Sequence, residues 1–231
     1  MIHFYNVTKV YPNHVKAISD ITLHISKGEF IFLVGPSGAG KSTICKLLFC
    51  EEAASGGQII FRGKSLSRMK RREVPYHRRT IGMVFQDFRL LPQKTAWENV
   101  AFALEVTGAP RRDIKRLVPP VLELVGLLHK ADAFPAQLSG GEQQRIGIAR
   151  AIVNNPLLIL ADEPTGNLDP DTSWDLMKLF QDINNRGTTI IMSTHDKQIV
   201  DTLRKRVIAL ANGKIARDEE RGEYGLCDSA P

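Results

Sequence analysis

The residues from Gly35 to Thr43, GPSGAGKST, combine glycines with a lysine and two hydroxyl side chains. Their spacing is a full match to GxxxxGK[ST], a loop whose backbone N–H groups surround phosphates. In such a loop Lys41 reaches the β and γ phosphates, and the Ser42 hydroxyl ligates Mg²⁺. The pattern predicts a phosphate loop, rather than an ordinary glycine-rich turn before a helix. It is formed by Gly35, Pro36, Ser37, Gly38, Ala39, Gly40, Lys41, Ser42 and Thr43.

Two carboxylates, Asp162 and Glu163, follow the apolar run LLILA at 157–161. A buried strand would deliver them to its carboxyl end, the edge at which open α/β sheets bind ligands. We expect Asp162 to be the outer partner of Mg²⁺. Because side chains alternate along a strand, we expect Glu163 to face an attacking water, which it orients and whose proton it accepts late. The alternative is a solvated acidic pair after a strand.

The elements that must position these residues alternate between strands and helices. Continuous apolar runs at 30–34 and 157–161 are typical of strands covered on both faces of a parallel sheet. Apolar residues at 18, 21, 23 and 25 approximate the period of a half-buried strand. Further strands are predicted at 59–61, 81–85, 189–193 and 207–211, and helices at 42–50, 96–107, 120–128, 140–154, 171–184 and 196–204. This alternation predicts a doubly wound α/β core.

Two regions depart from that alternation. Residues 88–138 contain helical patterns without intervening strands, which predicts a helical lobe inserted into the sheet domain. Within the lobe, Pro119 and Pro120 would break a helix, so we expect one helix to end before them and another to begin there. The segment from Arg217 onward has little apolar content and predicts a short, frayed tail.

The string LSGGEQQR at 138–145 predicts a second anion site. Ser139 is a good helix N-cap, and Gly140 and Gly141 would expose N–H groups at the positive end of the helix. Together with the phosphate loop and the acidic pair, this string resembles the signature of ABC (ATP-binding cassette) ATPases. The resemblance runs from Tyr11 to about Gly213 and implies a P-loop NTPase fold of ABC type, with an antiparallel N-terminal β region beside the mainly parallel core.

The resemblance implies roles for further residues. Tyr11 would stack on adenine, although a half-buried core tyrosine is the alternative. Gln86 matches the Q-loop glutamine, which contacts Mg²⁺ and links the catalytic core to the helical lobe. Residues 166–169, GNLD, match the D-loop, which touches a second subunit. His195 matches the switch histidine near the γ-phosphate.

The resemblance also implies a homodimer that sandwiches two ATP molecules head to tail. Each signature would complete the ATP pocket of the opposite subunit through Ser139, Gly140, Gly141 and Glu142. The implied catalytic residues are Lys41, Glu163 and His195, and the implied Mg²⁺ ligands are Ser42, Gln86 and Asp162. The expected domain organisation is an ATPase core with a β subdomain (1–87 and 139–216), a helical lobe (88–138) and a polar tail (217–231).

Among ABC ATPases, the stretch 72–104 with LSGGEQQR and ADEPTGNLD most resembles those of cell-division systems. That resemblance implies an integral membrane partner of the FtsX type and control of cell-wall hydrolysis. The runner-up is the ATPase of a lipoprotein-release or macrolide-type exporter. DNA-repair types insert a long coiled coil between the motifs that correspond to Gln86 and Leu138 of this chain, and translation types carry two cassettes. Neither feature is found in this sequence. A small-molecule kinase would have no reason to carry LSGGEQQR.

Composition limits the classes of protein that fit. The chain has 231 residues, 43% of them hydrophobic, which suffices for one sizeable core and a small second lobe. Its longest apolar run, Phe30 to Gly35, is too short for a transmembrane helix, and its first residues do not resemble a secretion signal. We therefore expect a cytoplasmic protein, peripheral on the inner face of the membrane through its partner. Three cysteines without a CxxC pair favour reduced thiols, and Cys45 a packing role.

The positive charge is concentrated in one segment. Lys and Arg number 31 against 25 Asp and Glu, and residues 62–79 alone hold eight Lys or Arg and one acid, Glu73. A local cluster of this kind indicates either a solvated basic face or a surface near anionic lipid or an acidic partner. Since the segment leads directly into the strand before Gln86, we predict that it serves the membrane side of the protein and does not bind nucleic acid.

Overall fold

The structure is a computed structural model that describes residues 1–225 and divides the chain into two units. The first unit joins Met1–Arg78 to the segment that begins at Thr189, and the second is the continuous segment Arg79–Thr188. The last part of the predicted tail, with Cys227, lies outside the described residues. The predicted core and lobe boundaries differ from this division and stay predictions.

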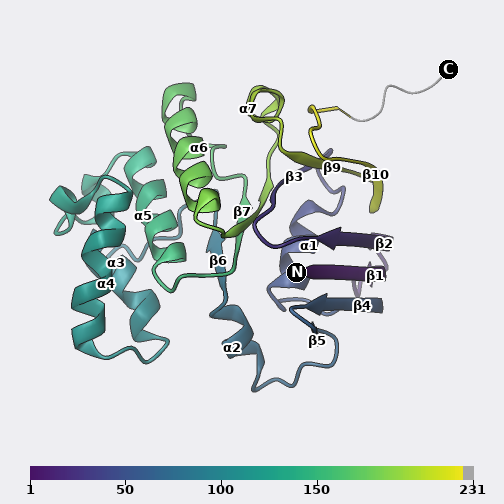
Figure 1. Cartoon of the computed structure of the whole chain (residues 1–231), viewed down its shortest axis with the longest axis horizontal. Helices are drawn as coiled ribbons and strands as arrows, with labels where there is room; N and C mark the ends of the chain where they lie inside the picture. Colours follow the sequence, from purple (N-terminus) through teal and green to yellow (C-terminus); the bar gives the residue numbers. More distant parts are fainter. Residues whose placement is uncertain (226–231) are drawn as a thin grey trace. The chain divides into compact units, whose positions relative to one another are not determined.

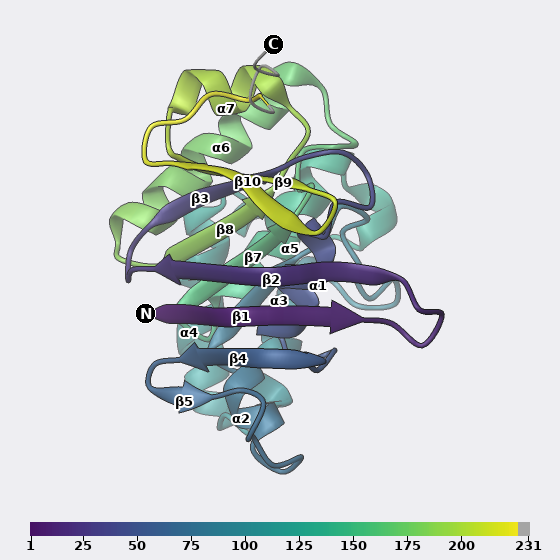
Figure 2. The ribbon, with the colours of Figure 1, turned by 90° about the vertical axis from the view of Figure 1, so that its right-hand side faces the viewer.

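An antiparallel sheet forms the N-terminal part of the first unit, in the order β2-β1-β4-β5 (Figure 2). Its strands are β1 (Ile2–Val10), β2 (Lys16–Ile25), β4 (Gly56–Phe61) and β5 (Lys64–Ser65). The apolar alternation predicted in β2 is confirmed, because Ile18, Ile21, Leu23 and Ile25 are all buried. The irregular step from Ile18 to Ile21 coincides with register shifts against β1 and with a positive φ of 54° at Asp20.

A second sheet in this unit carries the buried strand β3 (Phe30–Val34) in the order β10-β9-β3-β8. Both neighbours of β3, β8 (Thr189–Ser193) and β9 (Arg206–Ala211), run parallel to it, and all five residues of β3 are buried. The unit's helices are α1 (Lys41–Leu48), α2 (Val74–Arg78) and α7 (Lys197–Leu203). The continuous apolar run at 30–34 thus has the environment that its composition predicted.

The tail was predicted to fray from Arg217 onward, and for its first residues this is wrong. They belong to β10 (Lys214–Glu219), which pairs antiparallel with β9. After the strand, the Gly222 N–H donates to the carbonyl of Lys205 at 3.2 Å. Low hydrophobicity is compatible with a strand here, because an edge strand needs one ladder of backbone bonds and only one buried face.

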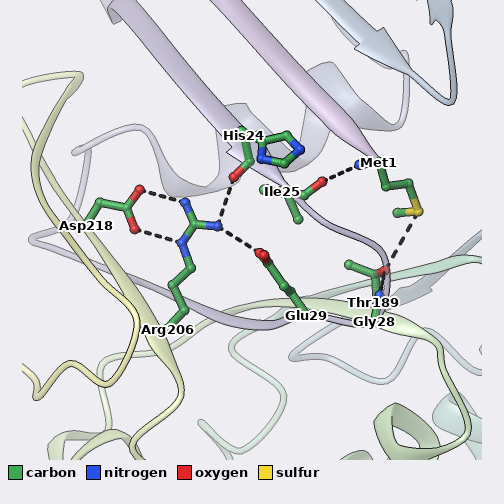
Figure 3. A network of polar contacts seen from close by, with 8 residues as sticks. All are labelled: Met1, His24, Ile25, Gly28, Glu29, Thr189, Arg206 and Asp218. Carbon is green, nitrogen blue, oxygen red and sulfur yellow. Dashed lines mark hydrogen bonds and ion pairs between the residues drawn. The ribbon is translucent and has the colours of Figure 1, made fainter.

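Arg206 joins β10 to the turn between β2 and β3 (Figure 3). Its Nε and Nη2 donate to the two carboxylate oxygens of Asp218 at 2.8 and 2.7 Å. Its Nη1 donates to Glu29 Oε2 at 2.8 Å and to the His24 carbonyl at 2.9 Å. The paired carboxylate of Asp218 raises the pKa of Arg206 further above its ordinary value. One guanidinium therefore links three segments of the first unit.

The second unit pairs the parallel strands β6 (Ile81–Val84) and β7 (Leu158–Asp162) and holds four α-helices (Figure 1). These are α3 (Ala96–Glu105), α4 (Arg111–Leu124), α5 (Gly140–Ile152) and α6 (Pro170–Asn185), with short 3₁₀ turns at Leu128–Lys130 and Pro135–Gln137. Parallel pairs, helices between them and the antiparallel N-terminal sheet confirm the predicted α/β class. Within residues 1–225, no helix has the length and hydrophobicity needed to cross a bilayer.

The prediction that a helix ends before Pro119 is wrong, since α4 runs through both prolines. Its apolar residues Ile114, Val118 and Leu122 recur every four positions and stay buried along the helix. The two prolines remove backbone bonds to the carbonyls of Lys115 and Arg116, which are exposed residues. Water can replace the lost donors on that side, so packing of the buried face outweighs the proline penalty.

Candidate nucleotide site

The predicted phosphate loop connects β3 to α1 in the first unit. It begins with Gly35, whose φ of 137° disfavours other residues, and a Cβ there would collide with the carbonyl of Leu210 on β9. Pro36, Ser37 and Gly38 are exposed, whereas Ala39 and Gly40 are buried under them. The loop is therefore anchored at its base and open to solvent at its tip.

Lys41 lies across this loop. Its Nζ donates to the carbonyls of Gly35 at 2.7 Å and Pro36 at 3.1 Å. The residue before α1 is Gly40, which has no side chain to cap the helix. The amides of the first turn of α1 and the Lys41 ammonium thus give the loop a positive potential, which suits phosphate oxygens.

Two other predicted residues of the first unit lie near the loop. The hydroxyl of Tyr11 is 3.4 Å from Thr43 Oγ1 in the first turn of α1, and Lys9 Nζ lies 5.0 Å from the Tyr11 ring centroid. His195 is exposed and follows β8. Leu33 pairs with Ser193 in the parallel register, so Gly35 and His195 leave the same edge of the sheet two residues later. The fold brings His195 and the loop to one edge of this sheet, and the role of His195 stays a prediction.

In the second unit, Gln86 and Glu163 likewise follow two paired parallel strands at equivalent positions. Val84 on β6 pairs with Ala161 on β7, so each of the two site residues comes two positions after a paired residue. Glu163 has a φ of 48°, a left-handed conformation that is uncommon and costly for a residue with a side chain. Strained backbone of this kind clusters at functional sites. Asp162, half-buried, is the last residue of β7.

The signature residues begin α5 through a capping box. Ser139 Oγ accepts from the Glu142 N–H at 3.3 Å, and Glu142 Oε2 accepts from the Ser139 N–H at 2.9 Å. Glu142 Oε1 also pairs with Lys130 Nζ at 2.5 Å, and these hydrogen bonds lower the pKa of Glu142. Glu142 is thus used for capping and for an ion pair, which the sequence analysis did not anticipate for a predicted nucleotide contact.

Gly141 has a packing requirement of its own. A Cβ at this position would overlap the Cγ2 of Thr172, near the start of α6. Any larger residue there would force the Thr172 side chain to move, so glycine fits this contact without rearrangement. The second glycine of the signature therefore serves the packing of α5 on α6, in addition to the exposed N–H group for which it was predicted.

Three polar residues of the second unit were not singled out by the sequence analysis: the buried Asn99 on α3, and the buried Gln144 and half-buried Arg150 on α5. Asn99 donates to the carbonyls of Leu91, Lys94 and Thr95 and accepts from the Leu91 N–H. Arg150 donates to the carbonyls of Phe88 and Arg89 at 3.0 and 2.6 Å. The available signal was a polar residue on the apolar face of an amphipathic helix, but the partners are backbone atoms that a sequence pattern cannot identify.

Not every basic side chain of the segment 62–79 faces solvent. Arg78 turns inward, where it donates to the carbonyls of Phe49 and Cys50 at 3.1 Å and stacks on the Phe49 ring. Arg68, Arg71 and Arg72 are exposed. The prediction of one basic face therefore needs a correction at Arg78, which has a structural role.

The predicted Mg²⁺ ligands are oxygen donors of suitable chemistry. A serine hydroxyl, a carboxamide oxygen and one carboxylate, from Ser42, Gln86 and Asp162, are the hard ligands that Mg²⁺ takes together with substrate phosphates and water. Among residues 1–225 no group of three or more His, Cys, Asp or Glu has the geometry to hold a metal by itself. The donor set therefore fits a Mg²⁺ that arrives with a nucleotide.

Residues 18–166 match the protein family described as ABC transporter. The chain is 59% identical to the cell division ATP-binding protein FtsE of Bacillus subtilis over 228 residues, which cover 99% of this chain and 100% of that protein. It is 49% identical to the Escherichia coli K12 protein of the same name over 215 residues, which cover 93% and 97% of the two chains. Similarity to these relatives thus extends over nearly the whole chain.

The fold also resembles those of solved structures. The dimeric ATP-binding cassette MJ0796 in a post-hydrolysis state with ADP and Pi superposes with a TM-score of 0.86, at 35% identity, over 97% of this chain and 100% of that chain. The chain cbiO1 of the Clostridium perfringens transporter complex cbiONQ gives a TM-score of 0.89, at 29% identity, over 95% and 88% of the two chains.

Proposed function

The chain belongs to the ABC transporter family, and we propose that it is the ATP-hydrolysing subunit of a cell-division system that acts on an integral membrane partner of the FtsX type. The observation that carries the nucleotide site is Lys41, whose ammonium lies on the carbonyls of Gly35 and Pro36 at the mouth of the phosphate loop. An incoming polyphosphate offers that ammonium stronger, charged acceptors than these two carbonyls.

In the proposed reaction, the loop amides and Lys41 bind the β and γ phosphates of ATP. Ser42, Gln86 and Asp162 hold the Mg²⁺, which neutralises charge on the phosphates. Glu163 orients the attacking water and accepts its proton, and His195 contacts the γ-phosphate. Tyr11 stacks on the adenine, which its position beside the first turn of α1 supports.

Two copies of the chain act together in this proposal. Ser139, Gly140, Gly141 and Glu142 of one copy close over the ATP held by Lys41 of the other, so each site is built from two chains. The capping box at Ser139 supports this, because it fixes the helix start whose amides would face the nucleotide. The dimeric state of the MJ0796 cassette supports the same arrangement.

A complementation experiment tests the two-chain site. Lys41→Ala and Ser139→Arg chains should each be inactive alone, whereas their mixture should recover part of the hydrolysis, because mixed dimers contain one site built from two intact halves. If heterodimers form and the mixture stays as inactive as its components, the head-to-tail arrangement is wrong. Nucleotide binding by Lys41→Ala within twofold of the parent would contradict the assignment of the loop.

The membrane partner is tested separately. We expect the chain to attach to the inner face of the membrane through that partner, and to regulate cell-wall hydrolysis instead of moving a solute. The full-length similarity to cell division proteins supports this over the exporter alternative. Capture of the tagged chain from detergent-solubilised membranes should recover an FtsX-type protein in amounts that respond to ATP. Recovery of a lipoprotein-release or macrolide-type permease instead would favour the exporter.

A further inference from the structure

One carboxamide on α5 contacts the backbone next to two predicted site residues. Gln144 is completely buried, and its Nε2 donates to the carbonyls of Phe85 at 3.1 Å and Pro164 at 2.7 Å. Phe85 immediately precedes Gln86, and Pro164 immediately follows Glu163. A single side chain thus connects the two segments that carry these residues.

A carboxamide such as that of Gln144 suits the space between these two carbonyls. Carbonyl oxygens only accept hydrogen bonds, so two of them facing one nitrogen fix the orientation of the amide and use both of its N–H groups. The Oε1 of Gln144 is buried without a hydrogen-bond partner. Since an unsatisfied buried oxygen is unfavourable, the side chain stabilises this arrangement through its two donors and not through its acceptor.

The same helix holds strained backbone on the Q-loop side. Phe88 and Arg89 have φ values of 57° and 46°, and their carbonyls accept from Arg150, six positions after Gln144 on α5. Glu163, on the other side, has the left-handed φ of 48°. Conformations of this kind persist only where surrounding contacts fix them, and the donors of α5 are such contacts.

We propose that Gln144 is a positioning residue for ATP hydrolysis, which sets the places of Gln86 and Glu163 by holding the backbone beside each. This inference rests on the roles proposed above for those two residues. Because α5 begins at the signature glycines, a displacement of α5 on nucleotide binding would move both carbonyls together. Gln144 would thereby couple the signature of a chain to the hydrolytic residues of the same chain.

The test replaces Gln144 by methionine, which keeps the length of the side chain and removes both donors. In the full chain, we expect the single-turnover rate of ATP hydrolysis to fall about tenfold, while the affinity and stoichiometry of a fluorescent ATP analogue stay unchanged. In a Glu163→Gln background, Gln144→Met should cause a clearly smaller further loss than it causes alone, since its effect through Glu163 is already gone and only its effect through Gln86 remains. A purely structural role would lower the number of binding sites and would give multiplicative losses.

Val118→Ala on α4 is the matched control for lost stability, because Val118 is also completely buried in the second unit and contacts neither segment through a side-chain hydrogen bond. Its rate per nucleotide-binding site should equal that of the parent. Gln144→Glu provides a second variant, because a protonated carboxyl retains one donor and an ionised one retains none. Its hydrolysis rate, relative to Gln144→Met at the same pH, should rise as the pH is lowered.

The outcomes separate this inference from the proposed function. A parental rate in Gln144→Met, or multiplicative losses in the double variant, would overturn the positioning role while leaving the nucleotide site intact. Unchanged hydrolysis by Lys41→Ala would contradict the proposed function whatever Gln144→Met does. A pH response of Gln144→Glu identical to that of Gln144→Met would also count against the role of the donors.

Discussion

Gln86 and Asn167 are hydrogen bonded in both directions: Asn167 Nδ2 donates to the carbonyl of Gln86 at 3.2 Å, and Gln86 Nε2 donates to Asn167 Oδ1 at 3.5 Å. The adjacent Gly166 packs closely against this pair, since a Cβ at that position would lie 2.8 Å from Gln86 Nε2. The predicted Q-loop and D-loop residues of one chain therefore restrain each other before any second subunit is considered.

We expect Asn167→Ala to reduce ATP turnover several-fold, because a hydrogen bond of this kind is worth about 1 kcal/mol and its loss frees the Gln86 side chain. Asn167→Asp should be intermediate, since a carboxylate still accepts from Gln86 Nε2 but donates nothing to the Gln86 carbonyl. Steady-state ATPase rates at saturating ATP measure the effect. Parental turnover in Asn167→Ala would mean that the pair has no part in hydrolysis.

Glu163→Gln should retain ATP binding and lose roughly a hundredfold in hydrolysis, the scale of a missing acid–base group. The amide keeps the size of the side chain but is a far weaker base. We expect an ATP-dependent dimer to accumulate, seen as an earlier peak on a sizing column. If the variant turned over ATP normally, the water-orienting role would belong to another residue.

The left-handed backbone at Glu163 predicts that glycine is more stabilising than alanine at this position. Glycine adopts a φ of 48° without steric cost, whereas alanine costs about 1 kcal/mol there. We therefore expect Glu163→Gly to unfold at higher urea than Glu163→Ala, opposite to the order in ordinary strands. Ala161, at a buried position of β7, serves as the reference: there the wild-type alanine should be more stable than Ala161→Gly. Equal midpoints for the two Glu163 variants would argue against the strain.

Charge reversal at Arg68, Arg71 and Arg72 should weaken recruitment to anionic vesicles or to the membrane partner, and leave the soluble ATPase rate unchanged. Each basic residue near an anionic surface contributes about 1 kcal/mol at moderate salt. Arg78 is omitted because it holds backbone carbonyls. The matched control reverses the exposed Arg111, Arg112 and Lys115 on α4. Equal losses in both triples would point to net charge alone, and submicromolar nucleic-acid binding lost in the first triple would overturn the membrane assignment.

His77 predicts a pH dependence of stability in the first unit. Burial lowers the pKa of His77, whose Nε2 lies 2.7 Å from the Leu48 carbonyl and whose ring packs edge-on against Phe61. The unfolded chain therefore takes up the proton at higher pH than the folded chain does. The contribution to stability is complete above the ordinary histidine pKa of about 6.5 and is lost as pH falls below it.

Urea midpoints of wild type and His77→Gln at pH 7.5 and pH 5.5 measure this effect. Glutamine can still donate to Leu48 but does not titrate, so its midpoint should change less over this interval than that of the wild type. The difference between the two profiles isolates His77 from the other titrating groups. Parallel profiles would contradict the prediction.

The sequence indicated the candidate site residues more directly than the contacts that hold them in place. Residues 35–43 and 162–163 were predictable because phosphate and metal chemistry restricts residue type at fixed spacing, and β3 was predictable because burial on both faces leaves an uninterrupted apolar run. Pro119 misled because the local cost of proline is visible in a sequence while the packing of Val118 is not. Gln144 was missed because its partners are backbone carbonyls, and the conformation of Glu163 is set by tertiary contacts.

The discontinuity of the first unit has a consequence for biosynthesis. Gly28 donates to Thr189 Oγ1 across 161 residues of sequence, and both strands that flank β3 are made after the whole second unit has been translated. Until then the apolar residues of β3 have no strand beside them, whereas the second unit is continuous and able to gather its helices earlier. A ribosome-bound chain should thus expose an aggregation-prone strand for most of its synthesis, and its yield should depend on chaperone capacity more than on equilibrium stability.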